Sequence, residues 1–249
     1  MPTKDIQSRP LTRVDVVLFT VRDFWNSERS ESLRLEVALT ERDEPPFAGW
    51  FNLPGSAVRV DRDESGRMDH SDQDTAERVV MEKLRVRPAH LQQICAAYSR
   101  TLDPRGPVTA ITYMALAPFD KIDYFEAQDI TFYPVDELPK LAFDQAAVIA
   151  KAVECVRENA RHSTLPAFML PRLFTLKELK SLYASVLGRE LDQSNFGRKF
   201  EEWGVLSMAD DDTREAAAVR ARARNTTGRP PQIFRLKGGA PVVFEKTAF

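Results

Sequence analysis

Charged side chains recur at helical spacing through the stretch TAERVVMEKLRV, which runs from Thr75 to Val86. In a helix that begins at Asp74, the side chains of Asp74, Arg78 and Glu82 stand four residues apart on one face. A hydrolase that works through Mg²⁺ needs several carboxylates on such a face to hold the ions and position a water. Here acid and base alternate, so the helix by itself indicates a solvent-facing ladder of ion pairs.

The elements that would position this helix begin with two strands. Residues 13–21 form an apolar, β-branched run typical of a buried strand, and residues 33–41 alternate like an antiparallel neighbour, with a hairpin loop at 22–32. Residues 45–60 have loop chemistry before a strand resumes. Residues 61–74 are strongly polar and are expected to form an exposed loop.

Further strands and a second helix follow. Residues 91–100 and 108–118 are interpreted as strands around a turn at 102–107, and residues 143–159 have a long helical pattern. Together these elements predict a mixed sheet with helices on its faces. We expect this first domain to span residues 1–162.

The remaining residues, 163–249, have a different character. A helix is predicted over 174–188, with Thr175 as its N-cap, Glu178 completing a capping box and Gly188 as its end. A tight turn leads to a second helix over 194–204, whose inward side chains would be Phe196, Phe200 and Trp203. Two short helices joined in this way are a helix-turn-helix candidate.

Two short segments after these helices could pair as the strands of a wing. They are residues 205–207 and 232–236. Between them lies a long charged insert, 208–227, whose structure the sequence does not indicate. The segment between the two strands contains the basic run Arg220, Arg222, Arg224 and Arg229.

Bulk composition limits the classes of protein that fit. The 249 residues suggest two domains, and a hydrophobic fraction of 43% is enough for packed cores. No apolar run reaches about 18 residues and the N-terminus lacks a signal-peptide core, so we expect a cytoplasmic protein without a membrane partner. Cys95 and Cys155 lack metal-type spacing and are expected to be buried free thiols. Residues 163–249 hold 14 Lys and Arg against 10 Asp and Glu, a charge that permits nucleic-acid binding without proving it.

With its flanking loop, FAGWFNLPGSAV, the helix resembles the Nudix hydrolase signature, Arg-Glu-apolar-x-Glu-Glu-x-Gly-apolar. The loop from Gly55 to Arg78 is about nine residues longer than that signature. Lysine in place of a carboxylate inverts the local charge, so metal binding in the usual mode, and hydrolysis with it, should be lost. In the alignment, Arg78 matches the signature Arg and Glu82 matches the second acid of the helix. The other four positions differ: His70 replaces the earlier Glu, Val79 the first acid, Lys83 the third acid and Arg85 the Gly.

Three further stretches narrow the resemblance. LDPRGPVTAITYMAL, FYPVDELPKLAFDQAAVIAKAV and the segment from FTLKELKSLYASVLG to GRPPQIFRL are similar to Nudix-related transcriptional regulators of bacterial NAD metabolism, the NrtR/NadQ group. The resemblance covers almost the entire chain, and it departs at Gln145, at Leu102 and in the insert. It implies an α+β protein in which a Nudix-like α/β/α sandwich domain is followed by a winged helix-turn-helix domain.

The same resemblance implies a function. The protein would be a DNA-binding repressor of NAD biosynthesis or salvage genes, without catalytic residues or a metal site. An adenine nucleotide, ATP or ADP-ribose, would be the effector, and no cofactor is expected. Winged-helix proteins that bind pseudo-palindromic operators act as twofold dimers, so a homodimer on double-stranded DNA is expected.

A pocket that binds rather than cleaves a nucleotide needs cations for its phosphates and rings for its base. For each cation the alternative is a surface side chain, and for each ring it is core packing. The candidates are Arg105, Arg59, Arg78 and Lys83 for the phosphates, and Trp50 and Phe47 for the adenine.

In the winged helix, the second helix should present its polar face to the major groove. Asn and Arg suit base edges, and residues at the helix start suit phosphates. Thr175 would act first as a cap, and the arginines of the insert would contact the backbone or minor groove unless they belong to a disordered loop. The candidates are Thr175, Gln193, Ser194, Asn195, Arg198, Lys199, Arg222, Arg224 and Arg229.

Two other functions are open at this point. A hydrolase of ADP-ribose or another nucleoside diphosphate could use a displaced set of acids, Glu64, Asp69, Asp72, Asp74 and Glu82. A protein-interaction module that uses the winged helix without DNA is the third possibility.

Overall fold

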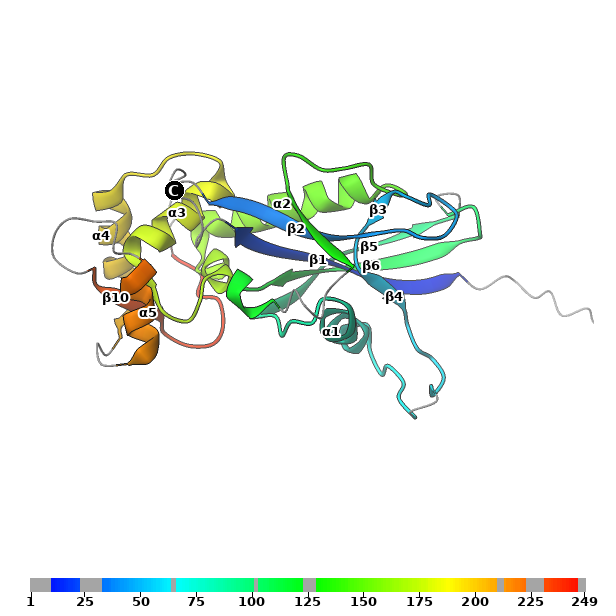
Figure 1. Ribbon diagram of the computed structural model, residues 1–249, viewed down its shortest axis with the longest axis horizontal. Coiled ribbons are helices and arrows are strands. Elements are labelled where there is room, and N and C mark those ends of the chain that lie inside the picture. Colours follow the sequence, from blue (N-terminus) through cyan, green and yellow to red (C-terminus); the bar gives the residue numbers. More distant parts are fainter. Residues whose placement is uncertain are drawn as a thin grey trace, which may run out of the picture. The chain divides into compact units, whose positions relative to one another are not determined.

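The computed structural model describes residues 10–22, 33–63, 66–100, 103–122, 129–209, 213–222 and 231–245 (Figure 1). Contacts divide the chain into two units. The first comprises residues 1–18, 37–115 and 122–152, and the second comprises 19–36, 116–121 and 153–249. The predicted domain boundary between residues 162 and 163 stays a prediction.

Seven of the described strands form one sheet, in the order β3-β2-β1-β6-β5, with β4 paired to β1 and β7 to β2 (Figure 1). Strands predicted from alternation and from apolar runs are confirmed as β1, β2, β5 and β6. The predicted hairpin loop at 22–32 lies outside the described residues except for Arg22, which ends β1. The strands are β1 (Leu11–Arg22), β2 (Arg34–Glu41), β3 (Phe51–Asn52), β4 (Gly55–Ala57), β5 (His90–Ser99), β6 (Val108–Leu116) and β7 (Ile130–Pro134).

The central strand is buried on both faces. Val14, Val16, Val17, Leu18 and Phe19 of β1 are all inaccessible to solvent. A continuous apolar run of this kind is expected where both sheet faces are covered. Helices α1 (Asp72–Lys83) and α2 (Gln145–His162) flank the sheet on opposite sides (Figure 1), which gives the Nudix-like sandwich predicted from the sequence. A short 3₁₀ helix, η1 (Phe119–Lys121), follows β6.

Helix α1 begins two residues before the expected position. Ser71 is its N-cap: the Ser71 hydroxyl accepts from the N–H of Asp74, and the Asp74 carboxylate accepts from the N–H of Ser71. The carboxylate of Asp74 also accepts from the N–H of His70 at 2.8 Å. The predicted ladder is therefore wrong at Asp74, because this carboxylate closes the end of the helix instead of facing Arg78.

In the second unit, two helices and a three-stranded sheet form the winged helix. The sheet has the order β8-β10-β9, and the pairing of β9 with β10 confirms the predicted wing strands. The predicted capping box of Thr175 with Glu178 and the end at Gly188 are also confirmed. The elements are η2 (Leu165–Met169), β8 (Phe174–Thr175), α3 (Leu176–Leu187), α4 (Gln193–Trp203), β9 (Leu206–Met208) and β10 (Ile233–Leu236).

Aromatic rings hold the two helices together. The Tyr183 ring of α3 lies 5.5 Å from the rings of Phe196 and Phe200 on α4, and those two rings are 4.7 Å apart. Phe196 and Phe200 are buried, as the sequence predicted. Trp203 is only partly buried and stacks on Phe244 at 3.7 Å.

The insert between the wing strands contains a helix that the sequence did not predict, α5 (Arg214–Arg222). Ala216 and Val219 of α5 pack on Leu173 and Ile233. The side chain of Arg222, and all of Arg224 and Arg229, lie outside the described residues.

Two other expectations concern thiols and membrane spans. Cys95 and Cys155 are free but half-buried, so the prediction of full burial is wrong. Within the described ranges, no helix is both long and apolar enough to span a bilayer.

Candidate functional site

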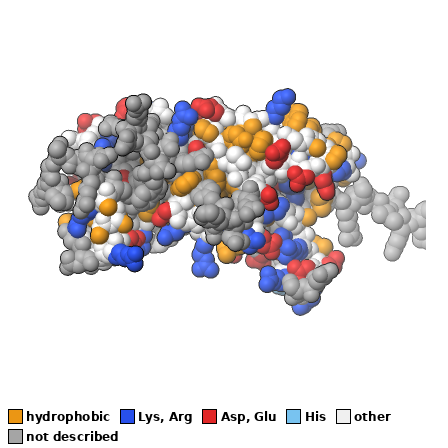
Figure 2. Space-filling view, viewed as in Figure 1, with side chains coloured by type: hydrophobic (Ala, Val, Ile, Leu, Met, Phe, Trp, Pro, Cys, Tyr) orange, Lys and Arg blue, Asp and Glu red, His pale blue; other side chains and the backbone are white. Residues whose placement is uncertain are grey.

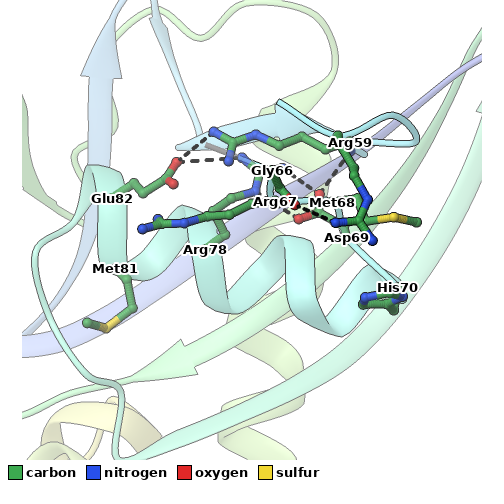
Figure 3. A pocket seen from close by; sticks show the side chains of 10 residues that line it. Arg59, Gly66, Arg67, Met68, Asp69, His70, Arg78, Met81 and Glu82 are labelled. Carbon is green, nitrogen blue, oxygen red and sulfur yellow. Dashed lines mark hydrogen bonds and ion pairs between the residues drawn. The ribbon is translucent and has the colours of Figure 1, made fainter. Parts of the chain in front are cut away.

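Arg78 connects α1 to β4 and to the preceding loop (Figure 3). Its Nε donates to Asp69 Oδ1 at 3.0 Å and its Nη2 to Asp69 Oδ2 at 2.7 Å. The remaining donors reach the Ser56 hydroxyl at 3.1 Å and the Ala57 carbonyl at 3.0 Å. This bidentate contact holds the pKa of Asp69 well below its usual range. Because its nitrogens are all used within the protein, Arg78 receives no support here as a direct ligand contact.

Arg59 and Glu82 extend this network. Arg59 donates to Asp63 at 3.0 Å and to Glu82 at 3.2 Å, and the guanidinium of Arg78 lies 3.7 Å from Glu82 (Figure 3). Glu82, the one helix acid that the signature comparison retains, is therefore balanced by two arginines.

Lys83 lies beside the glycine of the signature loop. Its Nζ donates to the carbonyl of Gly55 at 2.6 Å. Partial burial lowers the pKa of Lys83, and the charge of Arg13 lowers it further. A Cβ on Gly55 would stand 2.0 Å from Asp15 Oδ1, so only glycine fits at this position.

Asp15 and Arg13 form a polar pair on the otherwise apolar strand β1. Arg13 donates to Asp15 Oδ1 through Nε at 3.0 Å and through Nη2 at 2.5 Å. Burial raises the pKa of Asp15, and Arg13 opposes the rise. Neither residue was among the candidates predicted from the sequence, although an acid within the apolar run TRVDVVLF was a usable signal.

Arg13 and Asp15 line a small cavity of about 90 Å³ between the sheet and the start of α2. The side chains of Cys95 and Thr112 line it from β5 and β6, and Phe143 lines it next to α2. Gln145 also reaches the cavity, but its Oε1 accepts from the N–H of Leu53 at 2.7 Å. Gln145, one of the positions that depart from the family pattern, thus has a structural role in this chain.

Phe143 connects this cavity to an aromatic cluster that contains the two predicted rings. Its ring lies 5.1 Å from Phe47, which lies 5.2 Å from Trp50. The Trp50 side is open, at 37% exposed. Two cations lie over these rings, Lys140 over Trp50 and Arg42 over Phe143. Aromatic faces with nearby cations can hold a base next to phosphates.

Arg105 lies in the turn before β6 and forms a fork with Asp103. Its Nε and Nη2 donate to the Asp103 carboxylate at 2.9 and 2.6 Å. Asp103 lines the small cavity, whereas the guanidinium of Arg105 remains half-exposed. None of the four candidates Arg105, Lys83, Phe47 and Trp50 lines the small cavity itself, although Arg105 pairs with Asp103 and Phe47 packs on Phe143, and both of these partners do. The candidates Arg59 and Arg78 line a different pocket.

Helix α4 presents the polar face expected for a recognition helix. Gln193, Ser194, Asn195 and Arg198 are exposed, and Lys199 is half-buried. The N-cap is Asp192, whose carboxylate accepts from the N–H of Asn195 at 2.7 Å. Arg198 donates to Asn195 and to Glu202, both at 3.1 Å, so this guanidinium is held along the exposed face. Thr175 is buried and its hydroxyl caps α3, so its expected phosphate contact has no support.

The described acids of the hydrolase hypothesis each take part in a hydrogen bond or ion pair within the fold. Asp69 and Glu82 pair with arginines, Asp74 caps α1, and Asp72 accepts from the hydroxyl of Tyr113 at 3.0 Å. Burial, with this hydrogen bond, raises the pKa of Tyr113 to about 12. Across the described ranges, no three His, Cys, Asp or Glu side chains are placed to hold a metal ion, and Glu64 lies outside those ranges.

Comparison with known proteins defines the class. Residues 166–236 match the model of the NrtR DNA-binding winged helix domain. The chain is 28% identical to Shewanella oneidensis NrtR crystallised with a 27mer DNA, with a TM-score of 0.74 over 95% of this chain and 98% of that one. It is 27% identical over 231 residues to the ADPR responsive transcriptional repressor NtrR of Acinetobacter baylyi, covering 91% of this chain and 82% of the relative. A MutT/nudix family protein from Enterococcus faecalis, at 21% identity and a TM-score of 0.66, shares the fold.

The fold is therefore that of a Nudix-related protein with a C-terminal winged helix. Within this class, the chain is similar to proteins of the NrtR type: residues 166–236 match the NrtR winged-helix model, and 95% of the chain aligns with Shewanella oneidensis NrtR.

Proposed function

We propose that this protein is a transcriptional repressor that leaves its operator when ADP-ribose binds the Nudix-like domain. The observation that carries the proposal is the match of residues 166–236 to a DNA-binding domain, in a chain that aligns almost completely with a relative crystallised on DNA. The regulated genes would be those of NAD synthesis or salvage, and the protein would act in the cytoplasm.

ADP-ribose is favoured over ATP because the Acinetobacter relative is named for its response to ADP-ribose. Lys83, Arg13 and Arg105 supply the positive charge that a diphosphate needs. Phe143 and Trp50 supply faces for the adenine. The cavity of about 90 Å³ is much smaller than a nucleotide, so binding would require the half-exposed aromatic cluster to move.

The absence of hydrolysis follows from two replaced acids. Val79 stands where the first acid of the signature helix would be, and its side chain is 1% exposed, in the core. Lys83 replaces the third acid and binds the Gly55 carbonyl. An ammonium on this carbonyl disfavours a second cation there, so ADP-ribose would bind without Mg²⁺ and stay intact.

On DNA, α4 would lie in the major groove. Asn195 and Arg198 would contact base edges, whereas Gln193, Ser194 and Lys199 would contact phosphates. A homodimer would bind a pseudo-palindromic operator. The arginines of the insert, Arg222, Arg224 and Arg229, are proposed as additional backbone contacts.

The test is fluorescence anisotropy of the full-length protein on DNA upstream of its own gene and of NAD genes, with EDTA present. We expect salt-sensitive, sequence-selective binding that ADP-ribose weakens and ATP weakens less. Intact ADP-ribose recovered from the same samples, after incubation with Mg²⁺ in place of EDTA, would support the loss of hydrolysis. Turnover that Glu82→Gln abolishes, without selective DNA binding, would replace this proposal with the hydrolase.

A further inference from the structure

A second cavity, of about 430 Å³, opens between α1 and the two described parts of the preceding loop, 59–63 and 66–70 (Figure 3). Its volume lies in the range of roughly 300–1,000 Å³ found for small-molecule sites. The loop is the segment that makes this chain longer than the Nudix signature. None of the cavity's lining residues also lines the cavity that contains Arg13 and Asp15.

Ion pairs fix the walls of this cavity. The pair of Arg78 with Asp69 holds the loop against α1, and Arg59 joins Asp63 of the loop to Glu82 of the helix. The Arg78 and Asp69 side chains are only 11% and 5% exposed, so they form a rigid base. Both acids of the lining, Asp69 and Glu82, are thereby neutralised.

Two arginines of the lining are left with uncommitted donors. Arg62 donates only a long hydrogen bond, 3.4 Å, to the carbonyl of Gly66. Within the described residues, the guanidinium of Arg67 makes no hydrogen bond or ion pair, and only its backbone N–H is used, by Asp63. Both side chains are exposed. The lining as a whole has four arginines against one aspartate and one glutamate, an excess of positive charge.

Apolar side chains complete the lining. Met68 and Met81 belong to the lining, and Met81 is 48% exposed although it is a large hydrophobic residue. Methionine adapts to flat or irregular ligands. In the space-filling view, Lys and Arg side chains (blue) and Asp and Glu side chains (red) gather in the region where Figure 1 draws α1 and the loop before it (Figure 2).

We propose that this cavity is a second ligand site, which binds a compound bearing a phosphate or pyrophosphate group. Arg62 and Arg67 bind the anion through their guanidinium forks, and the two methionines contact the rest of the ligand. The site lies apart from the proposed ADP-ribose pocket and goes beyond the proposed function.

Isothermal titration calorimetry of the full chain with inorganic pyrophosphate, in buffer that contains EDTA, tests the proposal by measuring the dissociation constant. The variant Arg62→Gln with Arg67→Gln should weaken binding by about tenfold or more. The matched control, Arg87→Gln with Lys151→Gln, removes the same charge from exposed positions outside the cavity and should bind as the wild type does. Arg62→Lys with Arg67→Lys keeps the charge without the fork and should give an intermediate affinity.

Three outcomes would overturn the proposal. They are no binding by the wild type, equal losses in the glutamine variant and its control, and competition between pyrophosphate and ADP-ribose. The last would make the cavity part of the effector's own site. The titration needs no DNA, so failure of the repressor proposal in the anisotropy assay would leave its result unaffected.

Discussion

At the residue scale, the guanidinium of Arg78 is held on several sides by the Nudix-like unit. It makes four hydrogen bonds to the protein besides lying near Glu82, and it is nearly buried. Its function in this chain is to hold a loop on a helix. Arg78 was predicted to bind the ligand, but all its guanidinium nitrogens donate hydrogen bonds within the protein.

Arg78→Ala should therefore cost about 3 kcal/mol of unfolding free energy, because it leaves the Asp69 carboxylate buried without a partner. Urea unfolding at neutral pH measures the loss. Since the pKa of Asp69 is depressed from 3.8, the stabilisation is complete above that value and is lost as the pH falls through the folded pKa. In Asp69→Asn, the free energy of unfolding should therefore fall less between neutral and acidic pH than in the wild type. The same fall in both proteins would contradict the stabilising role of the Asp69 carboxylate.

Gly55→Ala should destabilise the protein by about 2 kcal/mol, since the added Cβ would meet Asp15 Oδ1 at 2.0 Å and the backbone oxygen of Val14 at 2.9 Å. Thermal unfolding measures the effect. The control is Gly239→Ala, where an added Cβ has nothing within 4 Å. Equal melting temperatures for the two variants would show that the strand and loop can separate without cost.

At the element scale, α4 combines a buried aromatic face with an exposed polar face. Phe196 and Phe200 fix its orientation, and Asn195 and Arg198 occupy the other side. Substitutions on the buried face should lower stability, whereas substitutions on the exposed face should change DNA binding and leave stability unchanged.

Arg198→Ala should weaken operator binding by about 1–3 kcal/mol and relax selectivity at one base pair, with the melting temperature unchanged. Lys199→Ala should weaken binding to all sequences and lower the salt slope by about one. Lys151→Ala, an exposed position on α2, is the control for charge alone. Anisotropy titrations at several salt concentrations distinguish the three. A loss that is the same for Arg198→Ala and Lys151→Ala would contradict the assignment of α4.

At the scale of the whole molecule, the proposal couples two sites. ADP-ribose can displace DNA only if it binds the DNA-competent state less tightly. The coupling is reciprocal, so saturating operator should lower ADP-ribose affinity by the same factor by which ADP-ribose lowers operator affinity. Calorimetric titration of ADP-ribose with and without operator measures the first factor. Anisotropy titration of operator with and without ADP-ribose measures the second. An ADP-ribose affinity that operator leaves unchanged would show that the two sites are not coupled.

A twofold dimer predicts the form of the operator. Two half-sites should lie about one helical turn apart, near 10 base pairs centre to centre. Footprinting and sedimentation of the complex would show two protomers on one site. A single protected half-site with one protomer would contradict the homodimer.

The sequence by itself determined the elements whose signals are local. Periodicity placed β1, α2 and the two helices of the winged helix, and the pattern of Thr175, Glu178 and Gly188 placed both ends of α3. Caps and periodicity depend on residues a few positions apart, so they can be recognised without the fold. The order of its motifs also indicated the resemblance to NrtR-type regulators.

Only the tertiary structure decided which charged residues are free to bind. Lys83 finds the carbonyl of Gly55 28 positions away, and Gln145 finds the N–H of Leu53 92 positions away. Helix α5 depends on Leu173 and Ile233, which the sequence places far from it. The energy of an ion pair or a buried contact depends on distance in space and on desolvation, and neither is encoded in residue type alone. For this reason the guanidinium of Arg78 holds the loop on α1, whereas within the described residues that of Arg67 makes no hydrogen bond.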